Sequence, residues 1–472
     1  MNNIVKILCI AILCLFICAC TKFLDVGDPP DKVAANFVYS SNSGAAGVLT
    51  GVFFDLQRQG EGFAQGRTGI SLFCGLAADE FNALPISSFN DMYTNTYPYD
   101  FWSVYYKFIY RINIALEAIG FSEKLSPDVK KHLLGEAYFL RGFIYFYLVN
   151  MYGDVPLLLT GDYKLNSKAA RVDRNKVYDQ IIKDLLDAET FLSSNYLEAN
   201  VRNISIDRVR PNKFSAKAML ARVYLYKQDW INAELKSTEV LSQKSYYDTV
   251  ALNEVFAKNS KESIWQLQPV SDGIRLNTLD AEMFTLINGK PDQYFNPVWV
   301  SDFLNHAFEI DDQRKNKWLG IAQDTSTKTE YLYISKYKYY SRNDVSKEYL
   351  TVLRVAEQYL IRAESRVHLN KLSQAKADLD IIRIRAGLKE IQLGSTDRLL
   401  NQIYHERQVE LFAEWGHRWF DLKRIGEIDQ VMTGVSPHKG GTWVSYKQLF
   451  PIPLYDLRYN VNLIQNAGYP SN

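Results

Sequence analysis

Aromatic, amide and guanidinium side chains gather in two stretches of the sequence that lack helical periodicity. The first is FNDMYTNTYPY at residues 89–99, with Arg67 upstream, and the second is DQYFN at residues 292–296, with Trp318 further along. Exposed aromatic rings can pack against the C–H face of a sugar, while amides and guanidinium groups hydrogen-bond its hydroxyls. We therefore predict a ligand-binding site; its candidate residues are Arg67, Asn90, Tyr93, Asn95, Tyr97, Tyr294 and Trp318. Local packing in the interior is the alternative for each aromatic ring.

The sequence lacks the usual motifs of catalysis. No G-x-S-x-G, P-loop or H-E-x-x-H motif is found, since Val409 stands where a second zinc-binding histidine would follow His405-Glu406. The acidic pairs Asp79-Glu80 and Asp311-Asp312 would suit a glycosidase only if they faced each other across a substrate, which chain neighbours rarely do. We expect a protein that is not an enzyme and that needs no cofactor, and leave calcium at these acidic loops open.

A run of charged and aromatic residues near the C-terminus has helical spacing. Its members are Glu406, Arg407, Glu410, His417, Arg418, Asp421 and Arg424. A catalytic cluster is conceivable, but such spacing favours ion pairs that hold helices together. We predict a buried ion-pair network here and expect Arg354 and Glu357 to contribute in the same way.

The start of the chain has the pattern of a lipoprotein leader. Lys6 precedes an apolar run, residues 7–19, that is short for a membrane span and ends in small residues before Cys20. We predict a signal peptide at 1–19, lipidation of Cys20, a tether at 20–31 and a single domain at 32–472. An ordinary signal peptide cut nearby is the alternative.

Composition excludes some functions. The 54 basic and 53 acidic residues leave no basic surface of the kind that binds nucleic acid. Three of the five cysteines leave with the predicted leader, so a lipidated Cys20 leaves Cys74 without a disulfide partner. Because Cys74 lies in an apolar stretch, we expect a buried free thiol.

Helical periodicity dominates the rest of the chain. Apolar stripes predict helices over 102–116, 129–150 and 177–192. Segments 213–241 and 354–388 each place two alanines twelve residues apart, which is typical of tetratricopeptide helix hairpins. Since residues 242–353 separate the two segments, we do not expect a continuous solenoid. Residues 263–268 alternate like a strand, and regions 61–100 and 244–345 are predicted to be rich in loops.

Motifs in family order give the chain a resemblance along nearly its whole length to the SusD/RagB family. They are CTKFLD (20–25), GEAYFLRG (135–142), YGDVPL (152–157), AMLARVYL (218–225), LRVAEQYLIRAE (353–364), RIRAGL (383–388), ERQVEL (406–411), GHRWFDLKR (416–424), FPIP (450–453) and QNAGY (465–469). The resemblance implies a mostly α-helical, SusD-like fold with four tetratricopeptide-like helix pairs and a loop-rich, ligand-binding part with minor β-structure.

The resemblance also implies a location and partners. It places the chain on the outer membrane, lipid-anchored and facing the cell exterior, where it would capture glycan for a SusC-like TonB-dependent transporter. Some members of the family bind peptides, so a peptide ligand is the nearest alternative. A helical glycoside hydrolase and a protein-binding adaptor without a small ligand are more distant ones. The identity and linkage of the ligand stay open.

Overall fold

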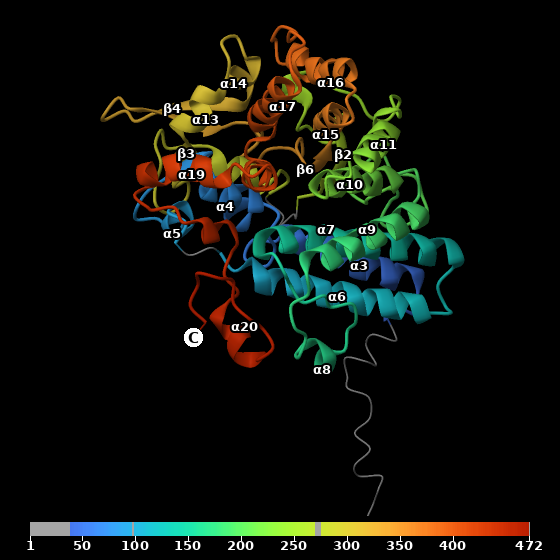
Figure 1. Ribbon diagram of the computed structural model, residues 1–472. Helices are drawn as coiled ribbons and strands as arrows, with labels where there is room; N and C mark the ends of the chain where they lie inside the picture. Colours follow the sequence, from blue (N-terminus) through green and yellow to red (C-terminus); the bar gives the residue numbers. More distant parts are fainter. Residues whose placement is uncertain (1–37, 97–98, 270–274, 472) are drawn as a thin grey trace, which may run out of the picture.

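The computed structural model describes residues 38–96, 99–269 and 275–471, which form a stack of helices joined to a loop-rich part (Figure 1). The predicted leader, Cys20, the tether and Tyr97 lie outside the described residues. The prediction of a mostly helical fold is confirmed. In the described part of the chain, no helix is both long and apolar enough to cross a bilayer.

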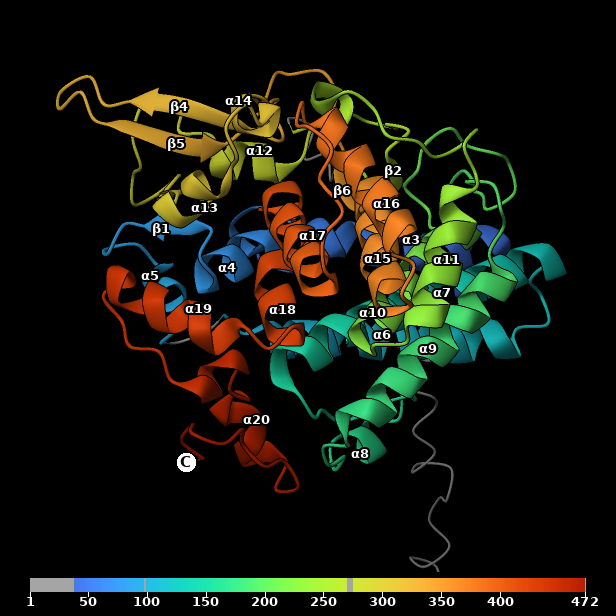
Figure 2. The same cartoon turned by 45° about the horizontal axis from the view of Figure 1, so that its top comes forward.

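Helices from distant parts of the sequence form one continuous stack, which Figure 2 shows side by side. In order of contact they are α6 (Phe101–Phe121), α7 (Pro127–Tyr152), α9 (Arg174–Phe191), α10 (Lys213–Tyr226), α11 (Trp230–Leu241), α15 (Val355–His368), α16 (Leu372–Arg385) and α17 (Thr396–Leu411). α3 (Asn42–Gln57) packs against α6 and α7, and α8 (Tyr163–Asn166) follows α7 in the chain. These eight stacked helices accommodate the four pairs that the resemblance implies.

Helix α7 lies inside this stack and is buried on nearly all sides. A Cβ atom added at Gly135 would lie 3.0 Å from the side chain of Leu192, and one at Gly142 would lie 3.1 Å from that of Leu185. The two glycines therefore let α9 approach closely. The helix ends at Tyr152, close to the predicted end at residue 150, and is followed by Gly153, whose φ of +74° favours glycine.

The two predicted helix hairpins are confirmed as α10–α11 and α15–α16. The alanines that marked them, Ala221, Ala233, Ala363 and Ala375, have no exposed surface, so paired helices approach closely at these positions. The expectation that the hairpins do not form a continuous stack is wrong, because α11 packs directly against α15. The intervening residues form the loop-rich part instead of separating the hairpins.

Within the described residues, three two-stranded antiparallel sheets organise the loop-rich part. They pair β1 (Phe81–Ala83) with β3 (Val298–Val300), β2 (Ser263–Leu267) with β6 (Leu350–Arg354), and β4 (Leu319–Gln323) with β5 (Glu330–Ile334). The predicted strand at 263–268 is thus β2. β6 runs directly into α15 and anchors this part to the helical stack, whereas β1–β3 ties region 61–100 to region 244–345.

Short helices occupy much of the predicted loop regions. They are α4 (Ile70–Ala77), α5 (Asn90–Tyr93), α12 (Leu279–Phe284), α13 (Asp302–Ala307) and α14 (Gln313–Trp318), and α18 (His417–Arg424), α19 (Ile428–Val435) and α20 (Leu454–Tyr459) follow near the C-terminus. α4 departs most from the predicted loops, because all eight of its residues are buried and its sequence is mostly apolar. It carries Cys74, which is a buried free thiol as predicted.

Candidate ligand-binding site

A pocket of about 560 Å³ lies between a 3₁₀ turn (Gly66–Thr68), helix α12 and two loops, residues 287–296 and 340–342. Three aromatic side chains at this pocket are exposed to solvent: Tyr294 at 71%, Phe295 at 68% and Tyr340 at 45%. Large rings are normally buried, so three exposed rings around one pocket indicate a binding surface.

Arg67 and Asp292 fix the loop that carries two of these rings. The Nη1 atom of Arg67 donates hydrogen bonds to the carbonyl oxygens of Tyr294 (2.7 Å) and Phe295 (3.1 Å). The main-chain N–H groups of the same two residues donate to Oδ1 of Asp292, at 2.9 and 2.8 Å. The guanidinium of Arg67 also lies 4.9 Å from the centre of the Phe89 ring. Both rings are therefore presented by a backbone that is held on two sides.

Buried polar groups join the 3₁₀ turn to α12 beneath the pocket. The carboxyl group of Asp280 accepts the N–H of Gly66 at 2.7 Å, and Oε1 of Gln65 accepts the N–H of Leu279 at 2.9 Å. Burial raises the pKa of Asp280 to about 7, and the Gly66 hydrogen bond lowers it only in part. Asn296 donates to the carbonyl oxygens of Glu282 and Met283. These contacts make the floor of the pocket a fixed surface.

The rim of the pocket carries polar groups that suit hydroxyl ligands. Arg275 and Glu282 form an ion pair of 2.8 Å, and Ser341 and Arg342 also line the pocket. Guanidinium groups donate and carboxylates accept hydrogen bonds, so the rim can donate hydrogen bonds to sugar hydroxyls and also accept hydrogen bonds from them. Aromatic rings flanked by such groups can bind a sugar by its C–H face and its edge.

The structure brings together two of the predicted site residues, Arg67 and Tyr294. Tyr93, Asn90 and Asn95 lie in and beside α5, and none of them lines this pocket. Tyr93 is only 8% exposed; its hydroxyl donates to Asn82, and Lys439 lies over its ring. Asn95 donates to the carbonyl oxygen of Ala77. A role of Tyr93 as an exposed stacking ring is therefore contradicted by its burial.

The prediction for Trp318 is also wrong. Its side chain has no exposed surface, and its Nε1 donates to the carbonyl oxygen of Leu252 at 2.9 Å. The ring packs against Phe256 and Phe412, with the ammonium of Lys336 at 4.7 Å from its centre. Trp318 is at the end of α14, and this short helix turns the ring into the core.

Sequence reasoning missed most residues of the pocket, among them Phe295, Tyr340 and Arg342. Phe295 is in the predicted segment, next to Tyr294, but the sequence alone does not single it out. Tyr340 and Arg342 belong to the tyrosine-rich stretch YLYISKYKYYSR (331–342), whose composition was a usable signal. The stretch begins within β5, which pairs with β4, and its end lines the same pocket as α12.

The acidic pairs considered for catalysis have structural partners. Asp79 forms a bidentate ion pair with Arg418, and Asp312 forms one with Arg314. Burial and the neighbouring Asp79 raise the pKa of Glu80 to about 8, and its carboxyl group accepts the N–H of Ala413. Across the described ranges, no group of three or more His, Cys, Asp or Glu side chains is arranged to hold a metal ion.

The predicted ion-pair network near the C-terminus is confirmed. Glu410, without exposed surface, accepts hydrogen bonds from Arg314, Arg354 and Arg385. Further buried pairs are Arg407–Asp421, Arg424–Glu364, Arg418–Asp79, Arg222–Glu357 and Arg314–Glu406. His417 is buried among these arginines, and burial together with their charge lowers its pKa well below the usual value. It therefore stays neutral and forms no ion pair there.

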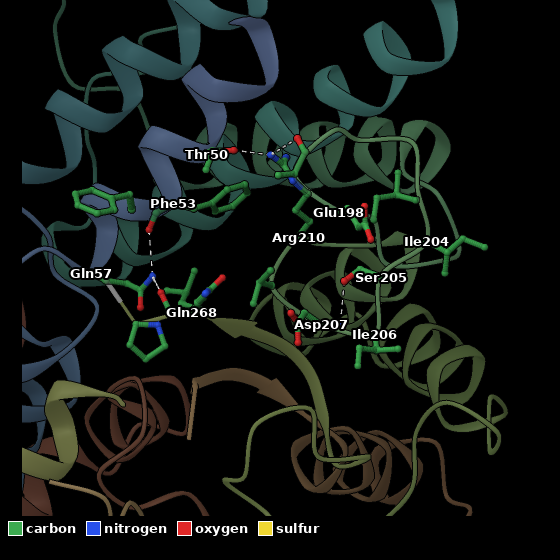
Figure 3. A pocket seen from close by; sticks show the side chains of 16 residues that line it. Thr50, Phe53, Gln57, Glu198, Ile204, Ser205, Ile206, Asp207, Arg210 and Gln268 are labelled. Atoms are coloured by element: carbon green, nitrogen blue, oxygen red, sulfur yellow. Dashed lines mark hydrogen bonds between the residues drawn. The ribbon is translucent and has the colours of Figure 1, made fainter. Parts of the chain in front are cut away.

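A second groove, of about 640 Å³, runs between α3 and the loop 197–210 (Figure 3). Gln57 donates to the carbonyl oxygen of Gln268 on one side, and Ile204 and Ile206 are exposed on the other. Phe54, at 44%, is its single well-exposed aromatic ring among the described residues. Since the pocket at Arg67 and Tyr294 offers three such rings, it is the better candidate for a sugar.

Two family models match the chain. One, described as "Starch-binding associating with outer membrane", matches residues 75–225, and the other, described as "SusD family", matches residues 304–469. The chain is 24% identical to SusD-like protein P25 of Formosa agariphila, over 96% of this chain and 98% of that one.

Solved structures share the fold. A SusD superfamily protein of Bacteroides vulgatus superposes with a TM-score of 0.77 at 21% identity, covering 91% of this chain and 99% of that one. A laminarin-binding SusD-like protein superposes with a TM-score of 0.73 at 22% identity, covering 90% and 99%. At this level of identity the likeness shows the fold.

Proposed function

Because the chain belongs to the SusD/RagB family, we propose that it captures a glycan at the cell surface and passes it, without cleaving it, to a SusC-like TonB-dependent transporter. The observation that carries the proposal is the set of exposed rings of Tyr294, Phe295 and Tyr340 around one polar-rimmed pocket. The laminarin-binding relative adds support, since its fold is the same.

Several features favour binding over catalysis. The acidic residues Asp79 and Asp312 are bound in ion pairs with arginines. At the pocket, Glu282 pairs with Arg275. A retaining or inverting glycosidase uses two carboxyl groups on opposite sides of the scissile bond. Glu282 is the single carboxylate residue that lines the pocket among the described residues.

The membrane anchor belongs to the same proposal. Cys20 follows a short apolar leader, and lipidation there would hold the protein at the outer membrane, facing the exterior. Replacing Cys20 with Ala should leave the fold intact and release the protein from the membrane fraction of cells that lack the transporter. Retention of the C20A protein in that fraction would refute the lipid anchor.

Calorimetric titration of residues 21–472 tests the capture of glycan. The panel holds laminarin, other neutral polysaccharides and oligosaccharides, and peptides, and chromatography of the spent samples detects cleavage. We expect a glycan to bind with a dissociation constant near the micromolar range, which corresponds to about −8 kcal/mol. Cleavage products would favour a glycoside hydrolase, and binding of peptides alone would favour peptide capture. No binding by any of these would favour an adaptor role.

The transporter partnership needs its own experiment. The wild-type protein should co-purify from outer membranes with a β-barrel of the SusC type, and the C20A variant tests whether that association depends on the anchor. Recovery of the wild-type protein free of any such barrel after mild detergent extraction would contradict the proposed delivery route.

A further inference from the structure

A third pocket, of about 790 Å³, lies where α7 ends and α9 begins. The turn between α10 and α11, the end of α18 and the C-terminal segment close its other sides. Its charged lining residues are Arg171, Arg174, Lys227, Lys423, Arg424 and Asp154. Five cations against one carboxylate make this pocket unlike the one at Arg67 and Tyr294.

The partners of these cations decide whether the charge is compensated. Arg424 is neutralised by Glu364, at 2.5 Å, and by Asp421, at 2.7 Å. Arg171 has neutral acceptors: the carbonyl oxygens of Tyr152, Asp154 and Ile464 and the amide oxygen of Asn466.

Among the described residues, the other three cations also have no carboxylate as an ion-pair partner. Lys227 donates to Oδ1 of Asn175 at 3.0 Å, and Lys423 donates to the carbonyl oxygen of Asn150. Arg174 forms no ion pair within the described part of the chain. The one acidic group, Asp154, accepts the main-chain N–H of Arg174 at 2.9 Å. Four cations therefore share the charge of one carboxylate.

Three buried arginines are paired differently, whereas Arg171 is half-buried and Arg174 is exposed. Arg141, Arg222 and Arg407 each have a carboxylate within 2.6–2.8 Å. Arg171 and Lys423 donate to the last carbonyl groups of α7, and this capping role explains why they lie at the pocket. Arg174 and Lys227 have no such role. Removal from water, together with the nearby charge of Arg174, lowers the pKa of Lys423 to about 7. An anion in the pocket would relieve this repulsion.

We propose that the pocket between the end of α7 and the start of α9 binds an oxyanion group, namely a sulfate, phosphate or carboxylate, with Arg174 and Lys227 as its main ligands. This site is separate from the glycan pocket and does not depend on the proposed function. The oxyanion comes either from a free inorganic ion or from a charged sugar, and the experiment distinguishes these sources.

The test is calorimetric titration of the folded protein at constant ionic strength and pH 7. The probes are sodium sulfate, sodium phosphate, a sulfated disaccharide and its unsulfated parent. We expect saturable binding of an anionic probe, weakened at least about tenfold in the double variant R174A/K227A because both cationic donors are removed; a tenfold loss corresponds to about 1.4 kcal/mol. If the sulfated disaccharide binds more tightly than inorganic sulfate, a charged sugar is the ligand. If inorganic sulfate or phosphate binds at least as tightly as the sulfated disaccharide, the free ion is the ligand.

Two control variants make the result specific. K176A removes a positive charge from an exposed position of α9 that does not line the pocket, and should leave binding unchanged. Y294A alters the glycan pocket and should also leave binding of the anionic probe unchanged. Loss of glycan binding can therefore be distinguished from loss of anion binding. The proposal is overturned if no anionic probe binds, or if K176A weakens binding as much as R174A/K227A does.

Discussion

The guanidinium group of Arg67 holds the main-chain carbonyl of Tyr294 at 2.7 Å, and so fixes the position of the most exposed ring of the candidate pocket. Tyr294 is 71% exposed, so little besides its backbone contacts determines where its ring lies. This contact joins the two loop-rich regions, which the β1–β3 pairing also connects. Ligand binding should therefore depend on both residues, although for different reasons.

Replacing Tyr294 with Ala should weaken glycan binding about tenfold, because a stacked ring contributes about 1 kcal/mol or more beyond its buried area. The free energy of unfolding should hardly change, since the ring is exposed. Tyr163→Ala, at a ring on α8 that is 67% exposed, is the matched control and should bind like wild type. Equal affinities of wild type and Y294A would exclude the ring from the site.

Replacing Arg67 with Ala should also lower affinity, because the loop at 292–296 loses its two hydrogen bonds to the guanidinium. In contrast to Y294A, this variant should show faster amide hydrogen exchange in that loop without ligand. Unchanged exchange together with lost binding would mean that Arg67 acts on the ligand alone.

Trp318 should matter for stability and not for binding. Trp318→Ala removes a fully buried ring and should cost about 3–5 kcal/mol of the free energy of unfolding, measured with urea. Glycan affinity, measured where the variant is folded, should equal that of wild type. The free energy of unfolding of Trp318→Phe should lie between those of wild type and Trp318→Ala. A variant that keeps its stability and loses binding would restore Trp318 to the site.

Much of the scaffold could be predicted because its signals are local. The apolar stripes at 102–116 and 129–150 became α6 and α7, and alanine spacing identified both hairpins. The packing of α11 on α15 could not be predicted, since it brings together helices that residues 242–354 separate in the chain and leaves no local signal.

The site was harder to predict for a related reason. The exposed Tyr294 and the buried Trp318 are alike in type and in loop-rich surroundings, and what separates them is the tertiary fold. Arg67 was found from its residue type, but its contact with a residue 227 positions away leaves no periodic signal. Tyr93 was misplaced because its burial against Lys439 depends on the C-terminal segment.

The ion-pair network should fail if its central carboxylate is neutralised. Burial would raise the pKa of Glu410, but Arg385, Arg354 and Arg314 hold it well below the ordinary value. Glu410→Gln leaves these three guanidinium groups without that charge and should lower the free energy of unfolding by about 3 kcal/mol or more. Glu330→Gln, at an exposed position of β5, should cost under about 0.5 kcal/mol. Similar urea midpoints for the two variants would contradict the role given to the network.

Asp280 should make the protein less stable as the pH rises. Its pKa is about 7 in the folded state and near 4 in the unfolded state, so between these values the folded state binds more protons. The free energy of unfolding then falls by about 1 kcal/mol per pH unit for this group, and levels off above pH 7. Asp280→Asn keeps an acceptor for the Gly66 N–H and removes the titration.

Urea unfolding of wild type and D280N at pH 5 and pH 8 checks this. The stability of D280N relative to wild type should increase from pH 5 to pH 8, while the raised pKa values of Glu80 and Glu348 cancel in the comparison. A difference that is independent of pH would show that Asp280 ionises normally in the folded protein.

The crystal structure of the protein with the tightest-binding oligosaccharide of the panel tests the account most directly. We predict that a sugar ring lies against Tyr294 or Phe295, with hydroxyls in hydrogen-bonding reach of the rim at Arg342 or Glu282, and that its glycosidic bonds are intact. A sugar bound in the groove between α3 and the loop 197–210, with the pocket at Arg67 and Tyr294 empty, would contradict the account.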